Sequence, residues 1–171
     1  SPVGEGWLAV RVMAAGNLSW DWALDTLLDR RRTKALARAD AVFRQSLLPP
    51  DGLVALPWLN RRNLFAPEAS GSGGFLGLNP HPTSADLLRA WVAGMCFELA
   101  RVFEPVVGSG TINSVVLGGG ASKGWYFRRL LAGLFAPLPV SCFEEEAAAG
   151  VRGTLYAFSR KVARCRTRRV P

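Results

Sequence analysis

The residues best suited to chemistry form a glycine-rich turn, Gly-Gly-Gly-Ala-Ser, at residues 118–122. A β-branched segment at 111–117 leads into the turn, and a helical pattern through about residue 135 leaves it. Glycine lets a ligand approach the main chain closely, and a helix that follows offers free N–H groups and the positive end of its dipole. A nucleotide phosphate or ribose suits such a place. A purely steric turn also explains the glycines, because the segment lacks both the P-loop and the Rossmann spacing.

Other reactive residue types form no catalytic or metal-binding pattern. The single histidine, His81, lies in a turn-like Asn-Pro-His-Pro segment without ligand-type neighbours. The three cysteines are far apart and include no C-x-x-C pair, which argues against a zinc site or a disulfide framework and favours a reducing cytoplasm. The aspartates fall on solvated faces of predicted helices or in a turn, so we predict no catalytic residue and no metal ligand. The cysteines are Cys96, Cys142 and Cys165, and the aspartates considered are Asp21, Asp25, Asp40, Asp51 and Asp86.

Strands and helices that could position the turn follow from hydrophobic periodicity and from Gly and Pro punctuation. The pattern predicts strands at 7–13, 52–56, 111–117 and 140–143, and helices at 20–28, 33–47, 84–103 and 144–158. A further helix should follow the turn that ends at residue 122 and run through about residue 135. Asn17 or Ser19 can cap the first helix, and Ser84 is the expected N-cap of the longest one. Residues 58–82 are expected to form a long loop. This order of elements indicates a layered α/β domain.

Composition and charge limit the classes of function. The 171 residues are enough for one domain, and 49% of them are hydrophobic. The formal net charge is +8, but six basic residues fall in 160–171, so the excess is mostly a tail and specific nucleic-acid binding is not favoured. The sequence has no uninterrupted apolar run long enough to cross a membrane and no signal-peptide pattern, so a soluble protein is expected.

Five segments, in order, resemble the C-terminal domain of the FGGY carbohydrate kinases. Residues 14–20 are similar to the family's Ala-Gly-x-x-x-x-Trp segment, and 56–60 with 72–78 to its Pro-Tyr-Leu-x-Gly-Glu-Arg and Gly-x-Phe-x-Gly-Leu stretch. Residues 84–101 take the place of the helix that carries Glu-Gly-x-Ala-Phe. Residues 118–125 resemble the adenosine motif Gly-Gly-Gly-Ala-x-Ser-x-x-Trp, and 145–157 the closing alanine-rich helix. Together these segments cover most of the chain.

The resemblance implies a fold and an activity. The fold is an actin-like ATPase (ribonuclease H-like) α/β domain, the C-terminal half of a two-domain sugar kinase. Residues 1–159 would be the nucleotide-binding domain and residues 160–171 a basic C-terminal tail. The full-length enzyme would transfer the γ-phosphate of ATP, bound with Mg²⁺, to a sugar or polyol hydroxyl.

The resemblance also assigns residues to the nucleotide. Gly119, Gly120 and Ala121 would line the adenosine and the α-phosphate, and Ser122 and Gly124 would lie near the base. Ala15, Gly16 and Ser19 would approach the nucleotide from the first strand-to-helix turn. The family commonly has a second glycine where Ala15 stands, so a methyl group there could crowd the ligand. The family's Gly-Glu-Arg is replaced by Arg61-Arg62-Asn63, which obscures the identity of the sugar.

Catalytic groups of the family are missing from this sequence. An Asp-x-Gly-Thr turn and the aspartate general base belong to the N-terminal domain of these kinases, so this chain by itself is expected to be inactive. Its expected partners are that N-terminal domain and a sugar or polyol, with no membrane; a homodimer is compatible with the sequence. The alternative is a stand-alone actin-like nucleotide-binding or regulatory module without kinase activity.

Overall fold

The computed structural model describes residues 13, 16–59, 72–143 and 167–169. The chain divides into two compact units. Residues 12–102 form one unit, and residues 103–171 together with 1–11 form the other. The predicted strand at 7–13 and the predicted helix at 144–158 lie outside the described residues, except for Met13.

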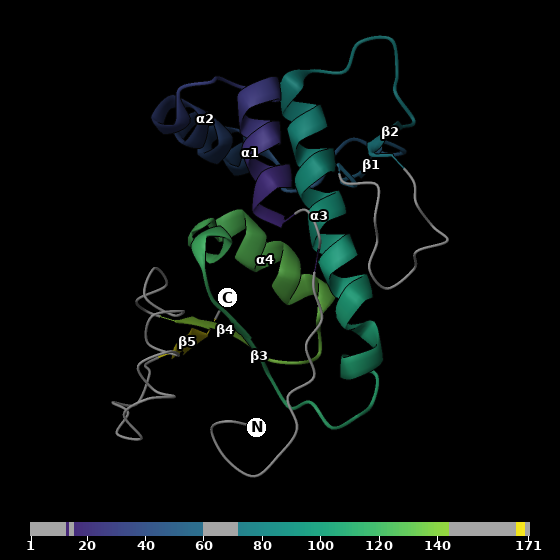
Figure 1. Ribbon diagram of the computed structural model, residues 1–171, viewed down its shortest axis with the longest axis vertical. Helices are drawn as coiled ribbons and strands as arrows, with labels where there is room; N and C mark the ends of the chain where they lie inside the picture. The colour runs from purple at the N-terminus through teal and green to yellow at the C-terminus, as the bar shows by residue number, and fades with distance from the viewer. Residues whose placement is uncertain (1–12, 14–15, 60–71, 144–166, 170–171) are drawn as a thin grey trace. The chain divides into compact units, whose positions relative to one another are not determined.

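Helices dominate the unit of residues 12–102. Helix α1 spans Gly16–Leu27, α2 spans Arg32–Gln45, and α3 begins at Ser84 and ends at Val107. Figure 1 shows α1 and α2 beside the first half of α3. The prediction that α1 starts near residue 20 was wrong by one turn, since the helix already begins at Gly16. Apolar side chains from all three helices form the buried core of this unit, among them Leu24, Phe43, Leu88, Trp91 and Val92.

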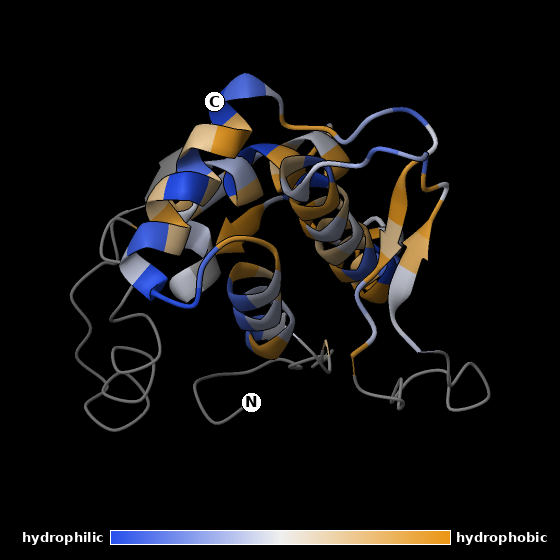
Figure 2. Cartoon of the chain, turned by 90° about the horizontal axis from the view of Figure 1, so that it is seen from above, coloured by the Kyte–Doolittle hydropathy of each residue, from blue (hydrophilic) through white to orange (hydrophobic). Residues whose placement is uncertain are grey.

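A short antiparallel ribbon lies in the same unit. Strand β1 (Val54–Leu56) pairs with β2 (Gly74–Leu76), with Val54 opposite Leu76. The ribbon is largely orange in Figure 2, because both strands are mostly apolar. The expectation of an uninterrupted loop over 58–82 was therefore wrong at β2. Three residues are too few to show an alternating pattern, and pairing with β1 is what makes them a strand.

Helix α3 begins with a capping box. The Thr83 hydroxyl accepts a hydrogen bond from the backbone N–H of Asp86 (3.1 Å), and the Asp86 carboxylate accepts from the Thr83 N–H (3.1 Å) and hydroxyl (2.6 Å). The N-cap is thus Thr83 and not Ser84, because only Thr83 forms this reciprocal pair.

Helix α3 also continues past Pro105, where the sequence pattern ended it at residue 103. Proline removes one intrahelical N–H, and so close to the C-terminal end the helix loses little by that. The backbone N–H of Gly108 then donates to the Glu104 carbonyl at 2.7 Å and closes the final turn.

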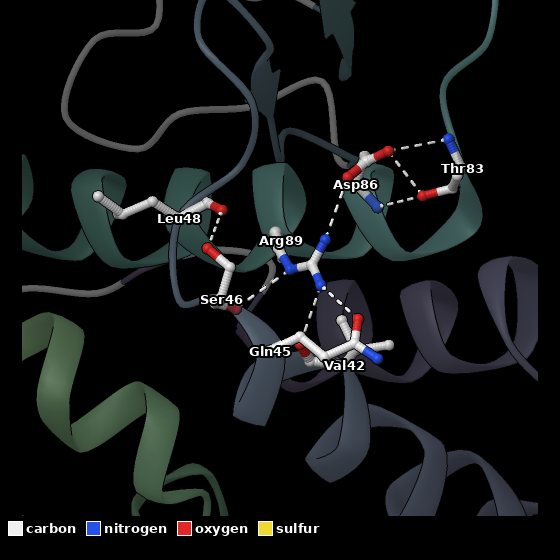
Figure 3. Close-up of polar contacts among 7 residues, drawn as sticks. All are labelled: Val42, Gln45, Ser46, Leu48, Thr83, Asp86 and Arg89. Atoms are coloured by element: carbon white, nitrogen blue, oxygen red, sulfur yellow. Dashed lines mark hydrogen bonds and ion pairs between the residues drawn. The ribbon is translucent and has the colours of Figure 1, made fainter.

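Arg89 joins α3 to the C-terminal end of α2, as Figure 3 shows. Its side chain is 9% exposed. The guanidinium donates to the carbonyls of Ser46 (3.1 Å) and Val42 (3.0 Å) and forms an ion pair with Asp86 (3.1 Å). A third α2 contact is the side-chain oxygen of Gln45, at 3.3 Å. The two bonds to backbone carbonyls lie at the C-terminal end of α2, where few intrahelical donors remain, and the Val42 carbonyl also accepts the Ser46 N–H at 3.5 Å.

The other unit holds a small mixed sheet with the order β3, β4, β5. Strand β3 (Val115–Leu117) is parallel to β4 (Val140–Phe143), and β4 is antiparallel to β5 (Thr167–Arg169). The prediction of β4 is confirmed, while β3 is shorter than the predicted 111–117. Strand β5 lies within the segment predicted to be a basic tail and pairs with β4 at the edge of the sheet.

The connection from β3 to β4 passes through two helical pieces. A 3₁₀ turn, η1, covers Gly120–Lys123, and α4 covers Trp125–Leu134. The helix predicted to follow residue 122 and to run through about residue 135 is confirmed as α4, and η1 precedes it. The extended backbone of Gly124 (φ −71°, ψ 113°) separates the two pieces and makes α4 start at Trp125.

Candidate functional site

The glycine-rich turn leaves β3 and enters η1. Gly119 has φ +90°, a backbone conformation that other residues rarely adopt. Gly120 is exposed, and a Cβ atom built there would meet no described atom within 4 Å. The main chain at Gly120 is therefore open to a ligand.

Ser122 holds this turn in shape. Its side chain is buried, and its hydroxyl donates a hydrogen bond to the Gly119 carbonyl at 2.6 Å. The Arg128 guanidinium donates to the Ser122 carbonyl at 2.9 Å and ties the turn to the first part of α4. No acidic residue occurs between residues 115 and 129, whereas Lys123 is exposed there, so the local charge suits an anion.

Ala121 and Gly124 are the other predicted residues of this turn. Ala121 lies in η1, between Gly120 and Ser122. Gly124 is the N-cap of α4, and a Cβ atom there would lie 3.0–3.2 Å from the rings of Tyr126 and Phe127. Close packing thus favours a glycine at position 124 whether or not a ligand contacts it.

The second group of predicted residues lies at the start of α1, in the other unit. Gly16 is the first residue of the helix, and a Cβ atom there would have Met13 Cε at 3.6 Å, an ordinary contact. Ala15 lies outside the described residues. Ser19, one turn into α1, is completely buried.

The hydroxyl of Ser19 is used within the protein. It accepts a hydrogen bond from Nε1 of Trp91 at 2.9 Å, and it donates to the Pro57 carbonyl at 3.5 Å. The same indole N–H lies 3.0 Å from the Ser19 carbonyl oxygen. The sequence pattern placed Trp91 within the predicted helix at 84–103 and assigned it no hydrogen bond. The one available signal for such a bond was that a buried indole N–H needs an acceptor.

A groove of about 460 Å³ lies in the unit of residues 12–102, between the 48–58 segment and α3. Its walls are mostly apolar and include Pro49, Val54, Gly94 and Phe97, with Glu98 and Arg101 of α3 among the lining residues. None of the predicted nucleotide residues lines this groove. The residues that the resemblance assigns to the nucleotide are therefore no part of this groove, whereas the family-like segments 56–60 and 84–101 contribute to its walls.

Cysteine and metal chemistry receive no support from the described residues. Burial raises the pKa of the Cys96 thiol to about 12, so the thiolate that would act as a nucleophile is absent near neutral pH. Cys142 is also buried. In the part of the chain that the structure describes, no three His, Cys, Asp or Glu side chains gather into a potential metal site. None of the described helices has the length and apolar content of a membrane span.

Comparison with known proteins identifies the family. Residues 1–160 match the model of the FGGY family of carbohydrate kinases, C-terminal domain. The chain therefore belongs to this family and corresponds to its C-terminal domain.

Individual relatives agree with this assignment. A xylulose kinase of Staphylococcus epidermidis is 25% identical over 134 residues, which cover 78% of this chain and 26% of that protein. The gluconate kinase of Lactobacillus acidophilus has a similar fold, with a TM-score of 0.67, 20% identity, and coverage of 89% of this chain and 32% of that one. Plasmodium falciparum glycerol kinase, crystallised with ADP, matches with a TM-score of 0.62, 15% identity, and coverage of 82% and 27%. The chain thus spans about a quarter to a third of the length of these kinases.

Proposed function

We propose that this chain is the ATP-binding part of an enzyme that transfers the γ-phosphate of ATP to a hydroxyl of a sugar or polyol. The main support is the family match over residues 1–160, which favours a kinase half over a stand-alone regulatory module. The open main chain at Gly120 agrees with a nucleotide that approaches the backbone closely.

Within this proposal, the glycine-rich turn contributes main-chain surface. Gly119, Gly120 and Ala121 contact the adenosine and the α-phosphate, and Ser122 and Gly124 lie near the base. The bond from the Ser122 hydroxyl to Gly119 keeps the turn in one conformation before ATP arrives, which lowers the entropy cost of binding. Ala15 and Gly16 approach the nucleotide from the start of α1, where free N–H groups favour negative charge.

The groups that move protons and hold the metal are assigned to the N-terminal domain. ATP supplies the phosphoryl group that is transferred, and the N-terminal domain supplies the general base and most of the Mg²⁺ site. The two domains share the actin-like fold in this proposal, and the enzyme acts in the cytoplasm. The relatives named above act on xylulose, gluconate or glycerol, so the acceptor class is a sugar, a sugar acid or a polyol.

Replacement of Gly120 tests the proposed site most directly. A Cβ atom at Gly120 meets no described protein atom within 4 Å, whereas one at Gly119 would be strained by its positive φ and one at Gly124 would crowd two aromatic rings. In the full-length kinase, Gly120→Val should leave the fold intact and raise the Kd for ATP by about tenfold or more, which corresponds to about 1.4 kcal/mol of lost binding free energy.

Gly133→Val is the matched control. Gly133 is also exposed and open, and it lies in α4 of the same unit. Its replacement should leave the ATP affinity unchanged. Equal affinities of the wild type and Gly120→Val, measured by titration calorimetry, would refute the assignment of this turn to the nucleotide.

A further inference from the structure

A buried hydrogen bond between Ser19 and Trp91 holds the first turn of α1 against α3. Trp91 is 1% exposed, and its indole N–H reaches both the hydroxyl and the carbonyl oxygen of Ser19, at 2.9 and 3.0 Å. The Ser19 hydroxyl faces the Pro57 carbonyl in turn. One serine side chain thus connects α1, the middle of α3 and the residue that follows β1.

Aromatic packing fixes the orientation of the indole. The ring of Trp22 lies 4.4 Å from that of Trp91, and the ring of Phe75 in β2 lies 5.4 Å from it. With neighbours on two elements, the Trp91 ring has little freedom to rotate away from Ser19. Trp91 therefore fixes where Ser19, and with it the first turn of α1, lies against α3.

We infer that Ser19 and Trp91 are positioning residues for ATP, a conclusion that rests on the proposed function. The family resemblance would bring Ser19 to the nucleotide itself, but its hydroxyl is buried and already bonded on the protein side. What it controls is the placement of Gly16, three residues earlier on the same helix. Phosphate binding by main-chain N–H groups depends steeply on distance and angle, so a small shift of this turn weakens the bonds to ATP.

Two mild substitutions in the full-length kinase test the inference. Ser19→Ala removes the acceptor hydroxyl with almost no change in volume, and Trp91→Phe removes the donor while it keeps an aromatic ring. Each should raise the KM for ATP by about three- to tenfold, the size of effect expected from one lost buried hydrogen bond. The KM for the sugar, and kcat at saturating ATP, should change by less than about twofold. The double variant should raise the KM for ATP by less than the product of the two single effects, because both substitutions remove the bond from the Trp91 N–H to the Ser19 hydroxyl.

Trp22→Phe is the control. It disturbs the same aromatic cluster without removing the Ser19–Trp91 bond, so it should lower the thermal stability and leave the KM for ATP unchanged. A merely structural role for Ser19 and Trp91 would give this same pattern in all three variants, and that result overturns the inference. A rise in KM with Ser19→Ala alone also overturns it, since it would indicate direct contact between Ser19 and ATP. A wild-type enzyme that fails to bind ATP would instead refute the proposed function.

Discussion

Asp86 shows how a residue assigned to a solvated helix face acquires a structural role. Its carboxylate accepts two hydrogen bonds from Thr83 and faces Arg89. The Thr83 hydroxyl is the largest cause of the lowered pKa of Asp86, followed by the Thr83 N–H, and the Arg89 charge acts in the same direction. All of these interactions stabilise the ionised form, so the folded state binds the proton less readily than the unfolded chain.

The lowered pKa of Asp86 predicts a pH-dependent contribution to stability. A folded-state pKa below the ordinary value of 3.8 means that the stabilisation is complete above that value and is lost as the pH falls through the folded-state pKa. Asp86→Asn should therefore lower the free energy of unfolding by about 1 kcal/mol at pH 7, as for loss of a helix cap. Urea denaturation at pH 7, 5 and 3 should show the difference from wild type shrinking below about pH 4. Asp51→Asn, at an exposed turn, serves as the control; a difference for Asp86→Asn that stays constant with pH would contradict the prediction.

At the scale of elements, the contact of α3 with β1 depends on one glycine. A Cβ atom at Gly94 would lie 2.3 Å from the carbonyl oxygen of Ala55, which is far inside van der Waals contact. The sequence pattern assigned Gly94 no role beyond its place in the segment 84–101 that resembles a family helix. In the structure, its missing side chain is what lets the strand backbone approach the helix.

Gly94→Ala should destabilise the protein although alanine is the better helix former. The helix and the strand must separate to admit the methyl group, at a cost of about 1–3 kcal/mol. Gly133→Ala in α4, where a Cβ atom meets no described atom, should instead raise the free energy of unfolding by about 0.5–1 kcal/mol. Thermal denaturation of the two variants gives opposite shifts in Tm if the packing argument is right, and shifts of the same sign would contradict it.

As a whole, the chain corresponds to only part of a complete kinase. The chain covers 26% of the Staphylococcus xylulose kinase and 32% of the Lactobacillus gluconate kinase, so most of each relative has no counterpart here. Phosphoryl transfer requires a positioned acceptor, a base and a metal, and the proposed role of this chain is to hold the nucleotide.

A comparison of the isolated chain with the full-length enzyme tests this division of labour. The isolated chain should unfold cooperatively and bind an ATP analogue weakly, but it should phosphorylate no sugar. The full-length enzyme should phosphorylate a sugar or polyol at a rate typical of kinases. Activity is best followed by ADP release in the presence of several sugars and polyols, and turnover by the isolated chain would show that the catalytic groups lie within it.

The glycine turn and the helical periodicities were readable from the sequence because both are local signals. Three glycines between a β-branched segment and a helix can hardly form anything but a turn, and an apolar stripe over residues 84–103 specifies a core helix. Strand β4 was predicted for the same reason, as a short segment with Val140 and Phe143 between prolines and acids. The order of five motifs also sufficed to recognise the family, which the match over residues 1–160 then showed.

The features that depend on residues distant in the sequence became visible only in the tertiary structure. Strand β2 exists because β1 pairs with it, and α3 starts at Ser84 with Thr83 as its N-cap because of a reciprocal bond between Thr83 and Asp86. The sequence placed Ser19 in a segment that resembles a family motif, and the resemblance predicts a role at the nucleotide. Only the fold showed that its hydroxyl points to Trp91, 72 residues later, because a hydrogen bond forms between atoms that packing brings within 3 Å and no local pattern records that distance.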